Sequence, residues 1–405
     1  MSTTTLTDPL GFPPLTAEAG RSQATSATHT LARDVPLTRL PSLDGWRALS
    51  ILLVLGSHTA LTAGFPEHLV KPFHYFFDGH MGVRFFFVVS GLLITWLMLG
   101  EERKTQKVNL RNFYARRALR ILPVYFAFLL VAGVLQYLTP CDHDLTTWAA
   151  NLTFTRDFFP GGNPLSNHFW SLAVEEQFYL LWPFLFVWLT PAVRTRIMPL
   201  LVAGAILAAF INRCLWEFPP SDAPFWRNLF HEWSFFNNVD SLAIGCMAAI
   251  WLAADERGLR SLLTSRPRLV ILAGVLMLAE PYVMHWLADR SWMPPVLKTF
   301  CWACWFGLGR TFQSFGFVIL ALQSIMQPFW GLYRCLNWRP VAALGVLSYS
   351  IYVWQNIFCA KPVKFGLIDP WWMTYPLWLV PALAAAILSY HLLEKPFFKL
   401  RHHFR

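Results

Sequence analysis

The stretch that decides the fold runs from Leu43 to Ala60 and reads LDGWRALSILLVLGSHTA. Beyond Arg47 it is almost entirely apolar, and the apolar character continues to about residue 63. A bilayer core of about 30 Å is crossed by about 20 such residues in a helix. The stretch therefore predicts a transmembrane helix over 46–63, with Arg47 at one end and His58 well inside it.

The composition extends this prediction to the whole chain. Hydrophobic residues make up 55% of the sequence and charged residues 14%, with a mean hydropathy of +0.41. A soluble domain averages about 45–50% apolar and about 25% charged residues. We expect an all-α fold, a polytopic membrane helix bundle of about ten transmembrane helices. Besides 46–63, the predicted spans are 83–99, 120–138, 172–190, 197–212, 238–254, 269–287, 312–327, 342–359 and 374–393.

The charge distribution predicts the orientation of the bundle. The N-terminal segment and the loops expected on its side carry 23 of the 33 Lys and Arg residues. Positive residues accumulate on the cytoplasmic side, so both termini are expected in the cytoplasm of a protein of the inner membrane. The net charge of +10 is then a topology signal and predicts no nucleic-acid partner. Residues 1–42 are expected to form a disordered cytoplasmic tail, and residues 43–405 the membrane domain.

A histidine in the middle of a span is the sharpest functional feature. His58 follows Arg47 by eleven residues, which places it about 16 Å deeper in the membrane. Ionisable residues at such depth usually face a cavity or a partner. His58 is either a general base or a structural histidine bonded to a neighbouring helix. The seven scattered cysteines include only one C-x-x-C pair, so no metal site is predicted.

Polar residues from other spans are expected at a similar depth. Hydrogen bonding between helices explains any one of them, but it explains their convergence on one half of the membrane less well. These candidates for substrate binding or catalysis are Arg84, Ser90, Glu175, Tyr179, Asp240 and Gln355.

Arginines dominate the opposite, cytoplasmic end of the bundle. Arg116, Arg117 and Arg120 lie on a basic amphipathic segment, and Arg47 is expected at the same level. Guanidinium groups bind phosphates in a bidentate manner. The positive-inside rule and contact with anionic lipid headgroups are the alternative explanations of this cluster.

Five stretches in this order resemble the acyltransferase-3 family of membrane-bound O-acyltransferases, along nearly all of residues 40–401. They are LDGWRALSILLVLGSH (43–58), GVRFFFVVSGLLIT (82–95), FYARRALRILPVYF (113–126), FWSLAVEEQFYLLWP (169–183), and SYSIYVWQ (348–355) followed by HLLEKPFF (391–398).

The resemblance implies a cytoplasmic acyl-CoA donor, with acetyl-CoA as the first candidate. It also implies an acceptor hydroxyl on a cell-surface polysaccharide, a lipid-linked sugar or a glycoside. His58 falls on the family's catalytic histidine and Arg47 on its basic partner. Arg116, Arg117 and Arg120 match the segment expected to hold coenzyme A, and Glu175 matches the regular acidic position.

The chain departs from the family pattern at two positions. Many relatives carry an acidic or amide residue where this chain has Arg84, and many carry histidine where it has Gln355. We expect direct transfer in which His58 deprotonates the acceptor hydroxyl and Glu175 orients His58 or the acceptor. The alternative is a multispan transporter or exporter of a glycan or glycoside without acyl transfer.

Overall fold

The computed structural model describes residues 40–138, 144–162, 164–217, 231–359 and 370–404. Residues 1–39, which make up most of the predicted tail, lie outside the described residues. The division into a tail (1–42) and a membrane domain (43–405) therefore stays a prediction.

The described part of the chain is mostly helical and contains no strand. Its longer helices are α1 (Leu43–Thr59), α3 (Gly79–Thr105), α4 (Leu110–Leu138), α6 (Phe169–Trp188), α7 (Pro191–Glu217), α9 (Phe235–Ala254), α11 (Pro267–Ala288), α13 (Gly309–Met326), α15 (Arg339–Cys359) and α16 (Leu379–Ser389). The shorter helices are α2 (Glu67–Phe76), α5 (Leu145–Leu152), α10 (Glu256–Thr264), α12 (Pro295–Ala303), α14 (Tyr333–Leu336) and α17 (Lys395–Leu400).

The predicted all-α architecture is confirmed, but the predicted number of ten spans is not. Each predicted span overlaps one of the longer helices. Within the described residues, six segments are long and apolar enough to cross a bilayer. They are Glu67–Thr105, which holds α2 and α3, and the helices α4, α7 (Pro191–Trp216), α9, α11 and α15. The other four predicted spans correspond to α1, α6, α13 and α16. Each of these helices is either shorter or less apolar than the six segments that meet the requirement for crossing a bilayer.

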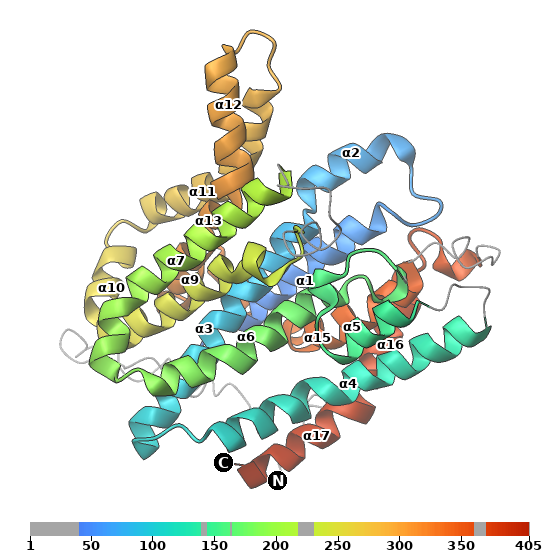
Figure 1. The fold of residues 1–405 in the computed structure, drawn as a ribbon, viewed down its shortest axis with the longest axis horizontal. Helices are drawn as coiled ribbons and strands as arrows, with labels where there is room; N and C mark the ends of the chain where they lie inside the picture. Colours follow the sequence, from blue (N-terminus) through green and yellow to red (C-terminus); the bar gives the residue numbers. More distant parts are fainter. Residues whose placement is uncertain (1–39, 139–143, 163, 218–230, 360–369, 405) are drawn as a thin grey trace, which may run out of the picture. The chain divides into compact units, whose positions relative to one another are not determined.

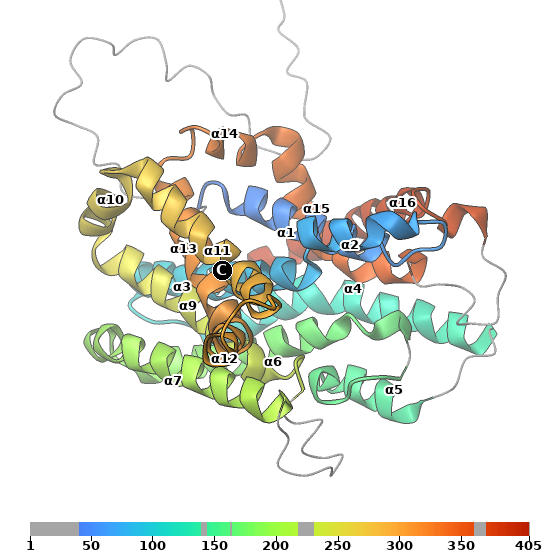
Figure 2. The ribbon, with the colours of Figure 1, turned by 90° about the horizontal axis from the view of Figure 1, so that it is seen from above.

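Four helices form the centre of the bundle. α3 packs along α9 on one side and along α1 on the other, and α1 in turn packs against α15. Figures 1 and 2 show α1 and α3 next to each other, with α15 beside α1. This arrangement matters for function because α1 carries Arg47 and His58, and α3 carries Ser90.

Glycines permit the close approach of these central helices. A Cβ atom added to Gly245 of α9 would lie 2.2 Å from the Val88 carbonyl oxygen of α3, and one added to Gly91 would lie 2.1 Å from the Leu242 carbonyl. Between α15 and α1, a Cβ at Gly345 would lie 1.8 Å from the Asp44 carbonyl oxygen. Small residues at such contacts let two backbones meet, as is common between membrane helices.

We expect Gly245→Ala to lower the thermal stability of the purified protein strongly. The added methyl group meets backbone atoms of α3, which cannot move away as a side-chain end can, and overpacking of this kind costs about 1–3 kcal/mol or more. Gly204→Ala on α7 is the matched control, because its Cβ would have no neighbour within 4 Å. Thermal unfolding in detergent measures both, and equal melting temperatures would contradict the close packing of α3 on α9.

Hydrogen bonds fasten α4 and α6 to this centre. Tyr349 of α15 donates its hydroxyl hydrogen to the Ile121 carbonyl oxygen of α4 at 2.8 Å. Trp182 of α6 donates its indole N–H to Thr95 Oγ1 of α3 at 2.9 Å. These bonds hold α4, which carries Arg117 and Arg120, at a defined rotation against α15, and α6, which carries Glu175, at a defined rotation against α3.

Candidate active site

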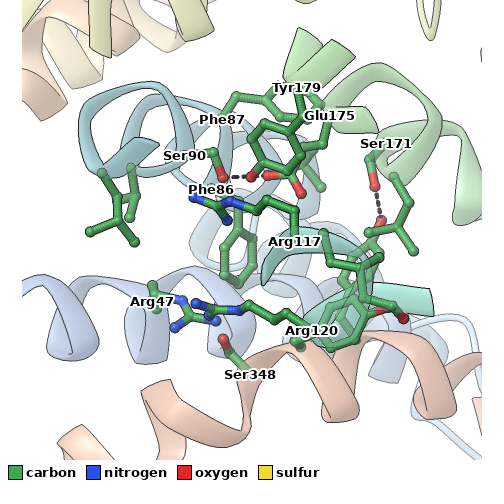
Figure 3. A pocket seen from close by; sticks show the side chains of 17 residues that line it. Arg47, Phe86, Phe87, Ser90, Arg117, Arg120, Ser171, Glu175, Tyr179 and Ser348 are labelled. Carbon is green, nitrogen blue, oxygen red and sulfur yellow. Dashed lines mark hydrogen bonds between the residues drawn. The ribbon is translucent and has the colours of Figure 1, made fainter. Parts of the chain in front are cut away.

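Side chains from α1, α3, α4, α6 and α15 surround a pocket that we name the arginine pocket. Figure 3 shows Arg47, Arg117 and Arg120 reaching into it from α1 and α4. Its cavity volume is about 80 Å³. Its lining residues are Arg47, Val83, Phe86, Phe87, Val89, Ser90, Leu93, Arg117, Arg120, Ile121, Ser171, Leu172, Glu175, Tyr179, Ser348, Tyr349 and Tyr352.

The arginine pocket carries an excess of positive charge. Glu175 is its one acidic lining residue, and its Oε1 accepts a hydrogen bond from Ser90 Oγ at 2.5 Å. Arg117 lies over the ring of Tyr179, with its guanidinium carbon 4.8 Å from the ring centre. Within the described residues neither Arg117 nor Arg120 forms an ion pair. Two guanidinium groups are thus available to an anionic ligand.

A second, larger cavity contains His58 and is named the histidine cavity. Its volume is about 500 Å³. Its lining residues are Val54, Ser57, His58, Leu61, Gly79, His80, Val83, Asn167, His168, Trp170, Glu232, Trp233, Tyr352, Asn356 and Cys359.

A hydrogen bond to Gln355 determines which nitrogen of His58 can act as a base. His58 Nδ1 lies 3.2 Å from Gln355 Oε1, and Gln355 is fully buried. Because a carboxamide oxygen only accepts hydrogen bonds, Nδ1 carries the hydrogen and Nε2 has the free lone pair. His58 is therefore oriented as a base that acts through Nε2.

Two residues, Val83 and Tyr352, line both spaces and so lie between them; we call this pair the neck. The Tyr352 hydroxyl donates to the His168 carbonyl oxygen at 2.9 Å and lies 2.6 Å from Ser171 Oγ. These contacts tie the ring of Tyr352 to the start of α6. The neck thus places the arginines on one side and His58 on the other.

The structure brings together most of the residues predicted from sequence. Arg47, Ser90, Arg117, Arg120, Glu175 and Tyr179 line the arginine pocket. His58 lines the histidine cavity and is hydrogen-bonded to Gln355. Glu175 and His58 lie in different spaces. The residue hydrogen-bonded to His58 is Gln355, whereas the sequence predicted that Glu175 orients either His58 or the acceptor.

Besides Gln355, which is hydrogen-bonded to His58, three predicted site residues lie outside the linings of both spaces. Arg116 pairs with Glu101 at 2.6 Å and donates to the Phe404 carbonyl at 2.8 Å. Arg84 pairs with Asp78 at 3.4 Å and also contacts Gln313.

Asp240 is the third of these residues. It accepts from Arg213 at 2.8 Å and from Thr311 at 2.6 Å, and both Asp240 and Arg213 are buried. Arg116, Arg84 and Asp240 thus form ion pairs with other residues of the protein, and their charges are not directed at either space. We therefore do not assign them to the site.

Some lining residues were not singled out from sequence. His168, Trp170 and Tyr352 lie in the two stretches FWSLAVEEQFYLLWP and SYSIYVWQ or directly beside them. Their position in or beside a recognised motif was the only signal in the sequence that could have pointed to them. The sequence does not show which face of each helix lines the cavity, because this depends on how the helices pack.

The comparisons with known proteins identify the family. A family model described as an acyltransferase domain, the acyltransferase-3 model, matches residues 40–391. The chain belongs to this acyltransferase family. Membership explains why five stretches of the family occur in order, and it favours an enzyme over the transport alternative. No solved structure gives a significant match to the chain.

Curated relatives of this chain carry O-acetyltransferase names. A Bacillus subtilis (strain 168) protein, provisionally named a peptidoglycan O-acetyltransferase, is 28% identical over 383 residues, covering 88% of this chain and 54% of its own length. A Listeria monocytogenes peptidoglycan O-acetyltransferase is 25% identical over 339 residues, covering 78% of this chain and 49% of its own length. The chain thus spans about half the length of these relatives.

Proposed function

We propose that the protein is a membrane O-acetyltransferase that moves an acetyl group from acetyl-CoA to a hydroxyl of a carbohydrate-containing acceptor. The observation that carries this proposal is the pair of adjacent spaces with two shared lining residues. An arginine-lined pocket suits an anionic donor, a cavity with an oriented histidine suits an acceptor hydroxyl, and both adjoin at Val83 and Tyr352. The names of the relatives supply the acetyl group and the class of acceptor.

The donor is assigned to the arginine pocket by charge. Coenzyme A carries phosphates at one end and the thioester at the other, joined by a flexible uncharged arm. Arg117, Arg120 and Arg47 hold the phosphates, because guanidinium forks match phosphate oxygens. Arg47 and His58 lie on the same helix and about 16 Å apart along its axis. The arm then passes Val83 and Tyr352 and delivers the thioester to His58.

The acceptor reacts at His58. His58 Nε2 takes the proton of the acceptor hydroxyl while that oxygen forms a bond to the thioester carbonyl carbon. The tetrahedral intermediate collapses with breakage of the carbon–sulfur bond, and the imidazolium returns its proton to the departing thiolate. Gln355 accepts the Nδ1–H bond throughout and stabilises the charged ring. The ester remains on the acceptor, and free coenzyme A leaves.

Transfer in proteoliposomes tests the proposal. The purified protein is reconstituted with radiolabelled acetyl-CoA on one side and a soluble oligomer of N-acetylglucosamine on the other. We expect label to appear on the oligomer as an alkali-labile ester. Normal acetyl-CoA binding without ester formation on any carbohydrate would refute the acceptor class. Failure to bind acetyl-CoA at all would refute the donor.

The proposed direction of transfer predicts the orientation of α4. Reporter fusions after Gln106, which follows α3, and after Asp144, which precedes α5, should report opposite sides of the membrane, with Gln106 in the cytoplasm. The reason is the concentration of Lys and Arg from the end of α3 through the first turns of α4. Equal signals from the two fusions would contradict both the orientation and the cytoplasmic donor.

A further inference from the structure

A carboxamide in the wall of the histidine cavity has an unused pair of N–H donors. Asn167 lines this cavity and precedes the first residue of α6 by two positions. Its Oδ1 accepts a hydrogen bond from Nη2 of Arg156 at 2.7 Å. Because a guanidinium group only donates, the atom that faces Arg156 is the amide oxygen, and the amide nitrogen Nδ2 lies on the other side of the carboxamide.

Nδ2 of Asn167 is free to bind a ligand. Within the part of the chain that the structure describes, Nδ2 donates no hydrogen bond, and it is not one of the fully buried side-chain atoms that lack a partner. The residue as a whole is half-buried. A molecule in the histidine cavity can therefore accept a hydrogen bond from this nitrogen.

The same turn of α15 holds both His58 and the segment that carries Asn167. Gln355 accepts the hydrogen bond from His58 Nδ1 at 3.2 Å. The next residue, Asn356, donates to the Leu165 carbonyl oxygen at 2.8 Å. This connection keeps Asn167 and His58 in the wall of one cavity.

Positive charge stands behind the Asn167 carboxamide. Arg156 is fully buried, and it forms no ion pair with any residue that the structure describes. Its charged hydrogen bond to Oδ1 polarises the carboxamide and strengthens Nδ2–H as a donor. The N-terminal end of α6, which carries a partial positive charge, begins at Phe169 beside it. Such a field stabilises an anion in the cavity more than a neutral group.

We propose that Asn167 Nδ2 donates a hydrogen bond to the thioester carbonyl oxygen and stabilises the negative charge that this oxygen gains. As the acceptor oxygen bonds to the carbonyl carbon, one electron pair of the C=O bond moves onto the carbonyl oxygen, and the hydroxyl proton moves to His58 Nε2. When the carbon–sulfur bond breaks, this electron pair re-forms the carbonyl group of the new ester, and the thiolate leaves. The inference rests on the proposed function, because it concerns the same reaction.

Two substitutions of Asn167 separate catalysis from structure. Asn167→Asp keeps an oxygen for Arg156 but replaces the N–H donors by a carboxylate oxygen, which repels the developing anion. Asn167→Ala removes both groups. We expect kcat to fall by about 10²- to 10³-fold in the alanine variant, the usual loss for one such donor, and to fall further in the aspartate variant. If Asn167 only holds Arg156, the order reverses, and the aspartate variant transfers at a nearly normal rate.

Transfer kinetics in proteoliposomes, with acetyl-CoA and the N-acetylglucosamine oligomer, give kcat and the KM for each substrate. Titration with acetyl-CoA and thermal unfolding first establish that each variant is folded. Both KM values should change little, because the bond to Nδ2 strengthens only as the anion forms. Asn237→Asp on α9 is the matched control. Its Oδ1 also accepts from arginines, Arg213 at 3.0 Å and Arg310 at 3.1 Å, but Asn237 lines neither space. This control should transfer at the normal rate.

The outcomes distinguish this inference from the proposed function. An unchanged kcat in Asn167→Ala, or a nearly normal kcat in Asn167→Asp, would show that Asn167 is structural. A raised acceptor KM with a normal kcat would also overturn the inference, because Nδ2 would then bind the acceptor and not the anion. If the aspartate variant does not fold, the alanine variant decides by the same comparison of kcat with KM. If the unmodified protein binds acetyl-CoA and acetylates no carbohydrate, the proposed function itself fails.

Discussion

Replacement of His58 by asparagine should leave a folded protein that binds acetyl-CoA normally and transfers almost no acetyl group. The asparagine amide lies near the position of Nδ1 and can still donate to Gln355 Oε1, so the buried glutamine keeps its partner. No atom of asparagine replaces Nε2, which is the nitrogen that takes the acceptor proton. A positioned base contributes about 10²- to 10⁴-fold in rate. Initial rates of transfer in proteoliposomes measure the loss.

The asparagine variant separates the two explanations of a histidine within a membrane helix. A structural His58 predicts near-normal transfer by the asparagine variant, because the hydrogen bond to Gln355 is retained. His285→Asn on α11 serves as the control and should transfer at the normal rate. Well-expressed His58→Asn protein with normal transfer would remove the base from the proposed mechanism and leave the histidine cavity without a chemical role.

The helical architecture was predictable from the sequence because long apolar runs have few structural outcomes. Each predicted span coincides with a helix of the bundle. The number of spans was less predictable, because α1 and α16 are short, with 17 and 11 residues. α1 lies in the centre of the bundle, where the neighbouring helices α3 and α15 bury its side chains, so a long apolar run is not needed there.

Depth along the membrane was also predictable, whereas helix rotation was not. Arg116 and Arg117 are adjacent and equally deep, but they differ by about 100° around the axis of α4. Only Arg117 faces the pocket, while Arg116 faces Glu101. In the same way Val83 forms the neck, and its neighbour Arg84 pairs with Asp78. A sequence gives the level of each residue, but the contacts between helices decide which one meets the site.

The partnership of His58 with Gln355 shows the same limit. The two residues are 297 positions apart, and only the packing of α1 against α15 brings their side chains together. Sequence reasoning placed both at a similar depth but assigned Gln355 to the substrate. The hydrogen bond instead makes it the residue that positions His58. His168 depends on α15 as well, through the Val353 carbonyl.

The donor site yields the second large effect. We expect Arg117→Gln combined with Arg120→Gln to lower acetyl-CoA affinity severely. Losing one charge-assisted hydrogen bond costs about 1.5–3 kcal/mol, or roughly 10- to 150-fold in affinity, and two guanidinium groups are lost here. Titration of the purified protein with acetyl-CoA measures the affinity. Glutamine keeps much of the side-chain length, which limits the change in packing against Tyr179.

Arg116→Gln is the matched control, because it removes the same charge from the adjacent position of the same helix. Its guanidinium is held by Glu101 and by the Phe404 carbonyl, so acetyl-CoA affinity should stay unchanged. If the cluster served only as a topology signal, replacing Arg116 and replacing Arg117 would have the same effect on acetyl-CoA affinity. The thioester of acetylated pantetheine, which lacks the nucleotide phosphates, refines the comparison further. The unmodified protein and the Arg117/Arg120 variant should bind it equally weakly, because the phosphates are the groups that these arginines hold. A large difference in pantetheine binding would place the arginines at the thioester and not at the phosphates.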